Sequence, residues 1–214
     1  MAKFDLFRES QDFAKRLTDL LNKTICNNTR LTAAVERSTG AVVVTNRPDK
    51  SDLARLMCVP ICLSGKPKLY LGLTVRLRPD SSGQHLMVVS SVMLLAGAVD
   101  GSKELLHYDY ERDKPDGYPE AHVQVCASSD QWEELLDGRP FKRLHLPVGG
   151  RRFRPTLEDL IEFLIAERLA DARPGWKQVV DEHRHVFQMI QLRAAIRRHP
   201  DVAREALADL DRDS

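Results

Sequence analysis

The sequence contains few cysteines and almost no excess of charge of either sign. Its 214 residues include 4 Cys, 32 Lys and Arg, and 31 Asp and Glu, for a formal net charge of +1. This balance excludes a histone-like or generally basic nucleic-acid coat, because such proteins depend on a cationic excess. The hydrophobic fraction of 43% is enough for a packed core, which excludes a disordered chain.

Two further absences concern location. The longest apolar run, residues 86–99, is interrupted by Ser90, Ser91 and Gly97 and falls short of the ~20 residues of a membrane-spanning helix. Charged residues are scattered through the N-terminal segment, where a signal peptide would have a continuous apolar stretch. Because cysteine is also scarce, we expect a cytoplasmic protein that makes no contact with a membrane.

The cysteines lack the spacing of a metal site. Cys58 and Cys62 are the only close pair, and the intervening Val59-Pro60-Ile61 differs from the two-residue spacing of zinc knuckles. We interpret both as core residues, since a free thiol behaves as a small hydrophobe, and a metal or redox role is the less favoured alternative. We therefore expect no metal and no cofactor.

Hydrophobic periodicity predicts an α+β fold. Apolar residues at helical spacing indicate an amphipathic first helix over residues 5–22. From residue 53 to residue 128 the period is two, which is typical of strands with one face in the core. Turn residues separate these segments, so successive strands are expected to pair as antiparallel hairpins. The predicted strands are residues 31–37, 41–45, 68–78, 86–96, 105–110 and 121–127.

The last third of the chain is predicted to be helical. Thr156 is the expected N-cap of a helix that runs to about Ala170, and further helices are expected over 176–198 and from Pro200. The predicted architecture is a curved antiparallel meander with an N-terminal helix and C-terminal helices packed on it. We expect a core domain of residues 1–170 and a helical extension of residues 171–214. Packing of the long helix on its own sheet is favoured, and binding of a partner is the alternative.

Polar side chains alternate with apolar ones on two of the predicted strands. His107 and Asp109 share one face of the first strand, and His122 and Gln124 share one face of the second. If these strands pair, the four side chains come within reach of one another. His145 lies between apolar neighbours in the same way. The candidate catalytic residues are therefore His107, Asp109, His122 and His145.

Three interpretations of this cluster remain open. Imidazole titrates near neutral pH, and a neighbouring carboxylate can orient it, so the residues suit proton transfer. Histidines and a carboxylate are equally ordinary ligands of a divalent metal. The third interpretation is the solvated side of a half-buried sheet, which is what polar alternation usually indicates.

A basic segment follows the predicted sheet. Between residues 139 and 154 the chain carries five arginines, one lysine and no acidic residue. Guanidinium groups and turn amides suit phosphate binding, and pairing with nearby glutamates in a solvated loop is the alternative. His183 and His185 are spaced too closely on a helix to face one metal, and we interpret them as solvent-exposed. The candidate substrate-binding residues are Gln124, Arg151, Arg152 and Arg154.

The order of several segments resembles a known family. Residues 106–110, His122 with Gln124, residues 144–147 and residues 155–159 are similar to the TumE-type toxin proteins of bacterial toxin–antitoxin modules. That family has a tyrosine–aspartate strand, a histidine-rich segment and a proline-led closing helix in this order. The resemblance covers residues 105–165 and departs from the family in the histidine-rich segment, which is represented here by His122 and His145. It implies a protein encoded beside a cognate partner and harmful or regulatory when alone.

These patterns together lead to two hypotheses of function. The first is a toxin–antitoxin or defence-type protein that acts on RNA or another phosphate-bearing substrate. In it His107 and His122 serve as acid and base, Asp109 orients one of them, and arginines bind phosphate. The second is a non-enzymatic interaction module that holds a protein partner through its C-terminal helices. The sequence leaves enzymatic activity and homo-oligomerisation open.

Overall fold

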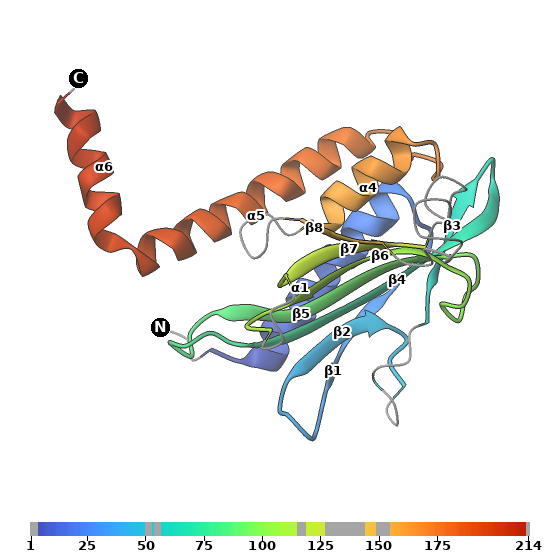
Figure 1. The fold of residues 1–214 in the computed structure, drawn as a ribbon, viewed down its shortest axis with the longest axis horizontal. Helices are drawn as coiled ribbons and strands as arrows, with labels where there is room; N and C mark the ends of the chain where they lie inside the picture. The colour runs from blue at the N-terminus through green and yellow to red at the C-terminus, as the bar shows by residue number, and fades with distance from the viewer. Residues whose placement is uncertain are drawn as a thin grey trace, which may run out of the picture.

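A long antiparallel sheet flanked by helices makes up the described part of the chain (Figure 1). The computed structural model describes residues 4–49, 53, 57–114, 119–126, 144–148 and 155–212, with 144–147 described by their backbone alone. The elements in chain order are α1 (Leu6–Thr24), β1 (Leu31–Val35), β2 (Val42–Asn46), β3 (Val59–Leu63), β4 (Lys66–Pro79), β5 (Leu86–Ala96), β6 (Glu104–Glu111), β7 (Ala121–Val125), β8 (Leu144–Pro147), α4 (Leu157–Ala166), α5 (Trp176–Arg198) and α6 (Pro200–Arg212).

The sheet confirms the predicted α+β meander. The strand order is β1-β2-β4-β5-β6-β7-β8, and β3 pairs with β4 beside this path. Every pairing is antiparallel, including the long β4–β5 hairpin that the sequence predicts. β3 is absent from the predicted strands, because Pro60 and Cys62 interrupt the β-branched pattern of its five residues.

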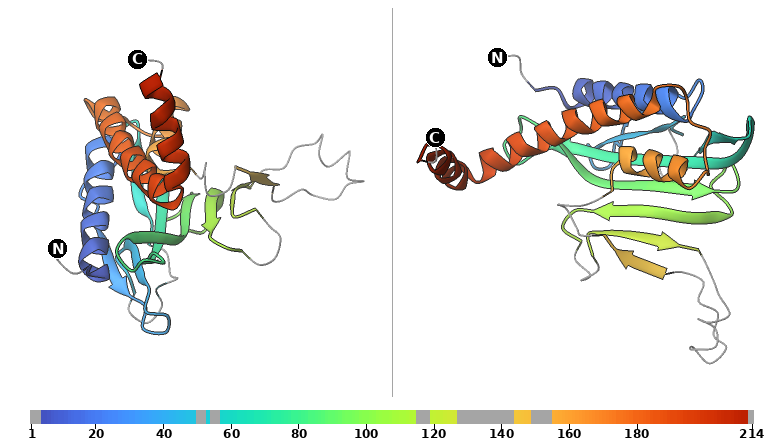
Figure 2. Two further views of the ribbon diagram at one scale, coloured as in Figure 1. Left: turned by 90° about the vertical axis from the view of Figure 1, so that its left-hand side faces the viewer. Right: turned by 90° about the horizontal axis from the view of Figure 1, so that it is seen from above.

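The helices α1, α4 and α5 cover one face of this sheet (Figures 1 and 2). Leu20 of α1, Ile161 of α4 and Val180 of α5 are essentially inaccessible and belong to one apolar cluster with the inward residues of β4 and β5. At the start of α1, the side chain of Asp5 accepts bonds from the backbone N–H groups of Phe7 and Arg8, as an N-cap should. The predicted first helix is therefore confirmed.

The helix α4 begins where predicted and ends earlier. Thr156 is its N-cap, and the Asp159 carboxylate accepts bonds from both the backbone N–H and the hydroxyl of Thr156. The expected end near Ala170 is wrong, because the helix ends at Ala166. Arg168 has a φ of 56°, and the N–H of Ala170 turns back to the carbonyl of Leu164. This left-handed residue closes the helix before the apolar pattern ends.

The two halves of α5 have different surroundings. Val180 in the first half is buried in the core, whereas Leu192 and Ile196 in the second half are 52% and 46% exposed. Only the first half therefore matches the expectation of a helix packed on its own domain. The predicted domain boundary at residue 170 stays a prediction. Residues directly after it bind the core, since Asp171 accepts bonds from the N–H groups of Ser64 and Gly65.

The remaining structural expectations concern cysteine and membranes. Cys26 and Cys58 are buried, as the core interpretation predicts for Cys58, and burial raises the pKa of each thiol to about 11. Cys62 is only partly buried. Among the described helices, none combines the length and the apolar character that spanning a bilayer requires.

Candidate functional site

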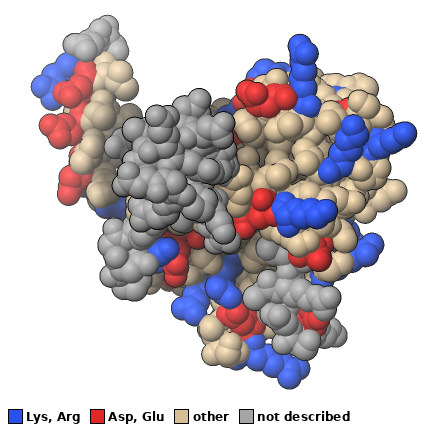
Figure 3. All heavy atoms as spheres, turned by 45° about the vertical axis from the view of Figure 1, so that its right-hand side comes forward, with Lys and Arg blue, Asp and Glu red and all other residues tan. Residues whose placement is uncertain are grey.

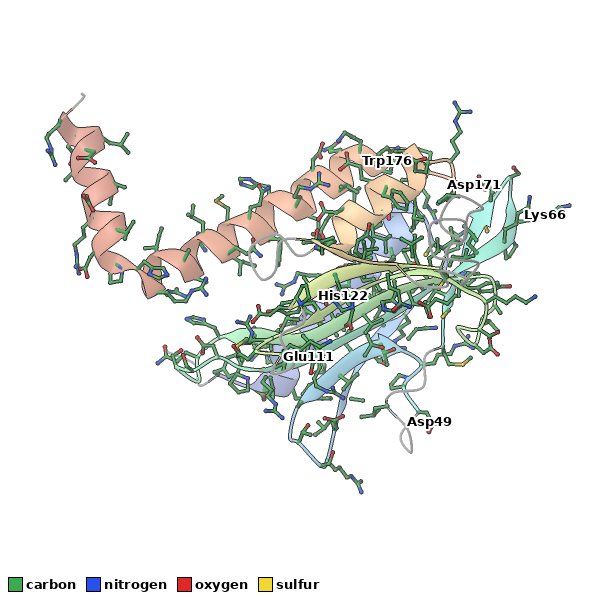
Figure 4. All side chains as sticks on the ribbon, viewed as in Figure 1. Asp49, Lys66, Glu111, His122, Asp171 and Trp176 are labelled. Atoms are coloured by element: carbon green, nitrogen blue, oxygen red, sulfur yellow. The ribbon has the colours of Figure 1, made fainter. Side chains whose placement is uncertain are left out.

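The pairing of β6 with β7 creates a polar cluster on the sheet face opposite the helices. Asp109 pairs with His122 and His107 pairs with Gln124 across these strands. Their strand neighbours Leu106 and Tyr108 point the other way, toward the helix-covered core. The predicted convergence of the two polar faces is therefore confirmed, and Figure 4 shows His122 on the sheet, apart from the start of α5 at Trp176.

Three of the predicted catalytic residues lie within reach of one shared point. His122 Nε2 is 3.9 Å from Asp109 Oδ2. The rings of His107 and His122 meet edge to face, with their centroids 6.4 Å apart. One nitrogen or carboxylate oxygen from each of the three side chains lies within 4.8 Å of the others. This spacing allows one group to receive a proton while another donates one to the same bound molecule.

Burial distinguishes this cluster from ordinary surface residues. His122 is 5% exposed and Gln124 is 3% exposed, whereas His107 and Asp109 are half-buried. The interpretation of a fully solvated face is therefore wrong for His122 and Gln124. The cluster therefore combines the buried imidazole of His122 with the partly exposed side chains of His107 and Asp109.

Glu104 is a member of the cluster that the sequence analysis missed. Its Oε1 lies 2.6 Å from Nδ1 of His107. In a regular strand these residues would point to opposite faces, but Leu95 pairs with Leu106 while Ala96 pairs with Glu104. The extra residue in β6 is a β-bulge that turns Glu104 to the side of His107. Strand alternation alone could not reveal this contact.

The other predicted site residues are Gln124, His145 and the three arginines. Gln124, expected to bind substrate, donates from Nε2 to Oε1 of Glu104 at 3.2 Å. It therefore helps to hold the carboxylate that holds His107. The backbone of His145 pairs with Gln124, which puts residue 145 in the same row of the same sheet face. Its side chain and residues Arg151, Arg152 and Arg154 lie outside the described residues.

The same cluster has the donor set of a metal site. Two imidazoles and one carboxylate are common ligands of divalent first-row metals. Glu104 contacts Nδ1 of His107, so Nε2 is the nitrogen of that ring that would bind an ion. Metal-binding histidines commonly have such a carboxylate on their second ring nitrogen. The residues that would hold an ion are His107, Asp109 and His122.

A second histidine–carboxylate pair lies on the other side of the sheet. His183 of α5 places Nδ1 at 2.5 Å from Oε1 of Glu158 in α4, and Glu158 is 3% exposed. The expectation that His183 is solvent-exposed is wrong, because its ring is partly buried and contacts Glu158 of the neighbouring helix. Burial alone would raise the pKa of Glu158, but hydrogen bonds from His183, from the backbone and from Thr156, with the charge of His183, lower it overall.

This second pair borders a small cavity. The cavity has a volume of about 60 Å³, and apolar side chains such as Leu17, Val75 and Met93 make up most of its wall. Nε2 of His183 is buried without a hydrogen-bond partner among the described residues. One or two water molecules would satisfy this nitrogen within such a volume. The pair therefore joins α4 to α5 at the wall of this cavity.

Comparisons with known proteins identify no relative. The chain matches no protein-family model, no curated protein and no solved structure. The resemblance to TumE-type toxins therefore stays a prediction. What the protein does has to be argued from its own side chains.

Proposed function

We propose that the protein is a toxin-type RNA-cleaving enzyme whose acid–base groups are His107 and His122. The observation that carries the proposal is the convergence of two imidazoles and the Asp109 carboxylate within 4.8 Å on one sheet face. Two imidazoles that close to each other act on one bound molecule, one as base and one as acid. The buried position of His122 excludes bulk water from that side of the reaction.

The proposed step moves two protons and exchanges one bond at phosphorus. One imidazole removes the proton of a ribose 2′-hydroxyl as its oxygen forms a bond to the neighbouring phosphorus. The bond from phosphorus to the 5′-oxygen breaks, and the second imidazole gives that oxygen its proton. Asp109, 3.9 Å from Nε2 of His122, stabilises that ring when it is charged, and Glu104 orients His107 through Nδ1. The products are a 2′,3′-cyclic phosphate and a free 5′-hydroxyl.

RNA is the favoured substrate because the proposed step needs its 2′-hydroxyl as the nucleophile. DNA lacks this group and would require an activated water in its place. Arg151, Arg152 and Arg154 at the end of the basic segment would supply the phosphate contacts, and they follow β8 in the chain.

The test is cleavage of end-labelled single-stranded RNA by the purified protein, beside a DNA strand of the same sequence. We expect cleavage of the RNA only, with a cyclic phosphate end. The His107→Ala/His122→Ala double variant should lose the activity. A matched His185→Ala variant, which removes an exposed imidazole from α5, should keep it. Equal cleavage by the double variant and the wild type would refute the assignment.

A chelator arm separates acid–base catalysis from metal catalysis at the same residues. The proposed mechanism predicts full activity in EDTA. Activity that disappears in EDTA and returns with one divalent metal would instead assign His107, Asp109 and His122 as metal ligands, which the 4.8 Å spacing of their donor atoms also permits. Metal analysis of the purified protein checks this second outcome independently.

A non-enzymatic interaction module is the second candidate, and the apolar exposure of the C-terminal helices favours it. Val202, Leu207 and Leu210 of α6 are each more than 60% exposed. In that case an induced chain would affect its host by binding, and the double histidine variant would act like the wild type. Growth after induction of both proteins at equal soluble levels distinguishes the two candidates.

A further inference from the structure

The C-terminal end of the structure consists of two helical arms with exposed apolar side chains. The first arm is residues 186–198 of α5, and the second arm is α6. In Figure 1 the first arm leads away from α4 and the second turns off at its end. Figure 3 shows charged side chains along one side of α6, at the upper left, and uncharged ones along the other. The large apolar residues exposed on the two arms are Val186, Met189, Ile190, Leu192, Ile196, Val202, Leu207 and Leu210.

The apolar residues of each arm form a stripe on one face. On the first arm, Met189, Leu192 and Ile196 follow at spacings of three and four, on the side away from the half-buried Phe187. On α6, Leu207 and Leu210 follow Ala203 at the same spacings. Such stripes are the pattern of helices that pack against another helix.

The second arm needs a covering surface to be a stable helix. It has 13 residues, and none of them is buried. Isolated helices of this length are marginal in water, since their stability normally comes from packing of an apolar face. The protein itself therefore leaves a helix that another surface has to stabilise.

The two arms are complementary in charge and equal in length. The first arm carries Arg193, Arg197 and Arg198 and no acidic residue. The second arm carries four acidic residues and two arginines, for a formal charge of −2. Each arm of 13 residues spans about 20 Å. The two arms are joined at His199. Because they are equal in length and opposite in charge, the basic arm of one copy is complementary to the acidic arm of another copy, and the reverse pairing is equally complementary.

We infer that the covering surface is a second copy of this chain. The first arm of one protomer packs its apolar stripe on the second arm of its partner, and the reciprocal contact forms on the other side of a two-fold axis. This arrangement is isologous and closed, so it produces a dimer and no larger assembly. Opposite charges on the two arms favour this pairing over contacts between like arms. The inference does not depend on the proposed RNA chemistry.

The test is the molar mass of the full chain in solution at micromolar concentrations, by sedimentation equilibrium. We expect a dimer for the wild type. Asp209→Arg/Asp211→Arg makes the second arm cationic, and Arg193→Glu/Arg198→Glu makes the first arm anionic. Each double variant should be mostly monomeric alone, because its own two arms then carry the same sign of charge. An equimolar mixture of the two should restore dimers, since each arm then meets one of opposite sign.

The matched control is Asp12→Arg/Asp19→Arg, which makes the same change of charge on the exposed side of α1. It should stay dimeric. A monomeric wild type overturns the inference, and so does a dimer that persists in both arm variants, because its interface would then lie elsewhere. Monomeric arm variants whose mixture stays monomeric would also overturn it, since the arms would not be pairing with each other.

Discussion

The molecule contains two histidine–carboxylate pairs, one on each side of its sheet. His183 and Glu158 are 2.5 Å apart between two helices, and the cavity beside them is mostly apolar. His122 and Asp109 are 3.9 Å apart on neighbouring strands, with a second imidazole at a centroid distance of 6.4 Å. The first pair is joined by a short hydrogen bond, whereas the members of the second are too far apart for one and lie beside another imidazole.

The difference shows that a histidine beside a carboxylate does not by itself make a site. Glu158 and Nδ1 of His183 form a hydrogen bond that joins α4 to α5. In the sheet cluster the carboxylates are shared, since Glu104 contacts both His107 and Gln124. A structural pair and a chemical pair should therefore respond to substitution in opposite ways, one in stability and the other in activity.

The largest expected difference is between His122→Ala and His183→Ala. Loss of an acid–base imidazole should lower the rate of RNA cleavage by about 10²- to 10⁴-fold. His183→Ala should change the rate per folded molecule only slightly, because that ring lies on the other side of the sheet. Rates are compared at matched folded fractions from urea titrations. Equal losses in both variants would remove the distinction between the two pairs.

Glu158→Ala should have the largest effect on stability. Removing one partner of a buried, hydrogen-bonded pair costs about 3 kcal/mol, because the other partner stays buried without its contact. Asp109→Ala, at the half-buried pair, should cost less than about 1 kcal/mol. The measurement is the free energy of unfolding in denaturant. A Glu158 variant as stable as the wild type would show that α4 and α5 are held by apolar contacts alone.

Glu104→Gln should have an intermediate effect, confined to activity. Glu104 is a positioning residue, and we expect a loss of about 10- to 100-fold, the size seen when a carboxylate that orients a metal-bound histidine is removed. The measurement is the rate of RNA cleavage at matched folded fractions. The stability of the variant should equal that of the wild type. An unchanged cleavage rate would contradict the positioning role.

The smallest expected effect is a pH dependence of stability due to Glu158. Its pKa in the folded protein lies below the ordinary value of 4.5. The folded state therefore favours the carboxylate, and the resulting stabilisation is complete above pH 4.5. It is lost as the pH falls through the lower folded pKa. Melting temperatures between pH 7 and pH 3 should show a smaller acid loss in Glu158→Gln than in the wild type.

Local patterns predicted most of the fold and part of the site. The period of two in β4 to β7 and the turns between these strands determine which residues share a face, so His107, Asp109, His122 and Gln124 are found together as expected. The N-cap at Thr156 was predictable because it is a short contact within one turn. Such features depend on neighbours in the chain, which a sequence displays directly.

The missed contacts depend on residues far apart in the chain or on a local irregularity. Glu104 reaches His107 because a β-bulge breaks the alternation of β6, and alternation was the basis of the prediction. His183 meets Glu158 across 25 positions of sequence, and no spacing rule relates them. α4 ends early because Arg168 has a left-handed backbone conformation. Arginine rarely adopts this conformation, so the sequence does not predict it.

The amino-acid sequence by itself determined the classes of elements, the faces of the strands and the types of side chain offered for chemistry. Only the tertiary structure decided which carboxylate contacts each histidine, because those contacts depend on sheet register, one bulge and the packing of α5 on α4. Periodicity is a property of consecutive residues. Proximity between His183 and Glu158, or between His107 and Glu104, is created when distant apolar residues are buried together and the backbone adjusts to that packing.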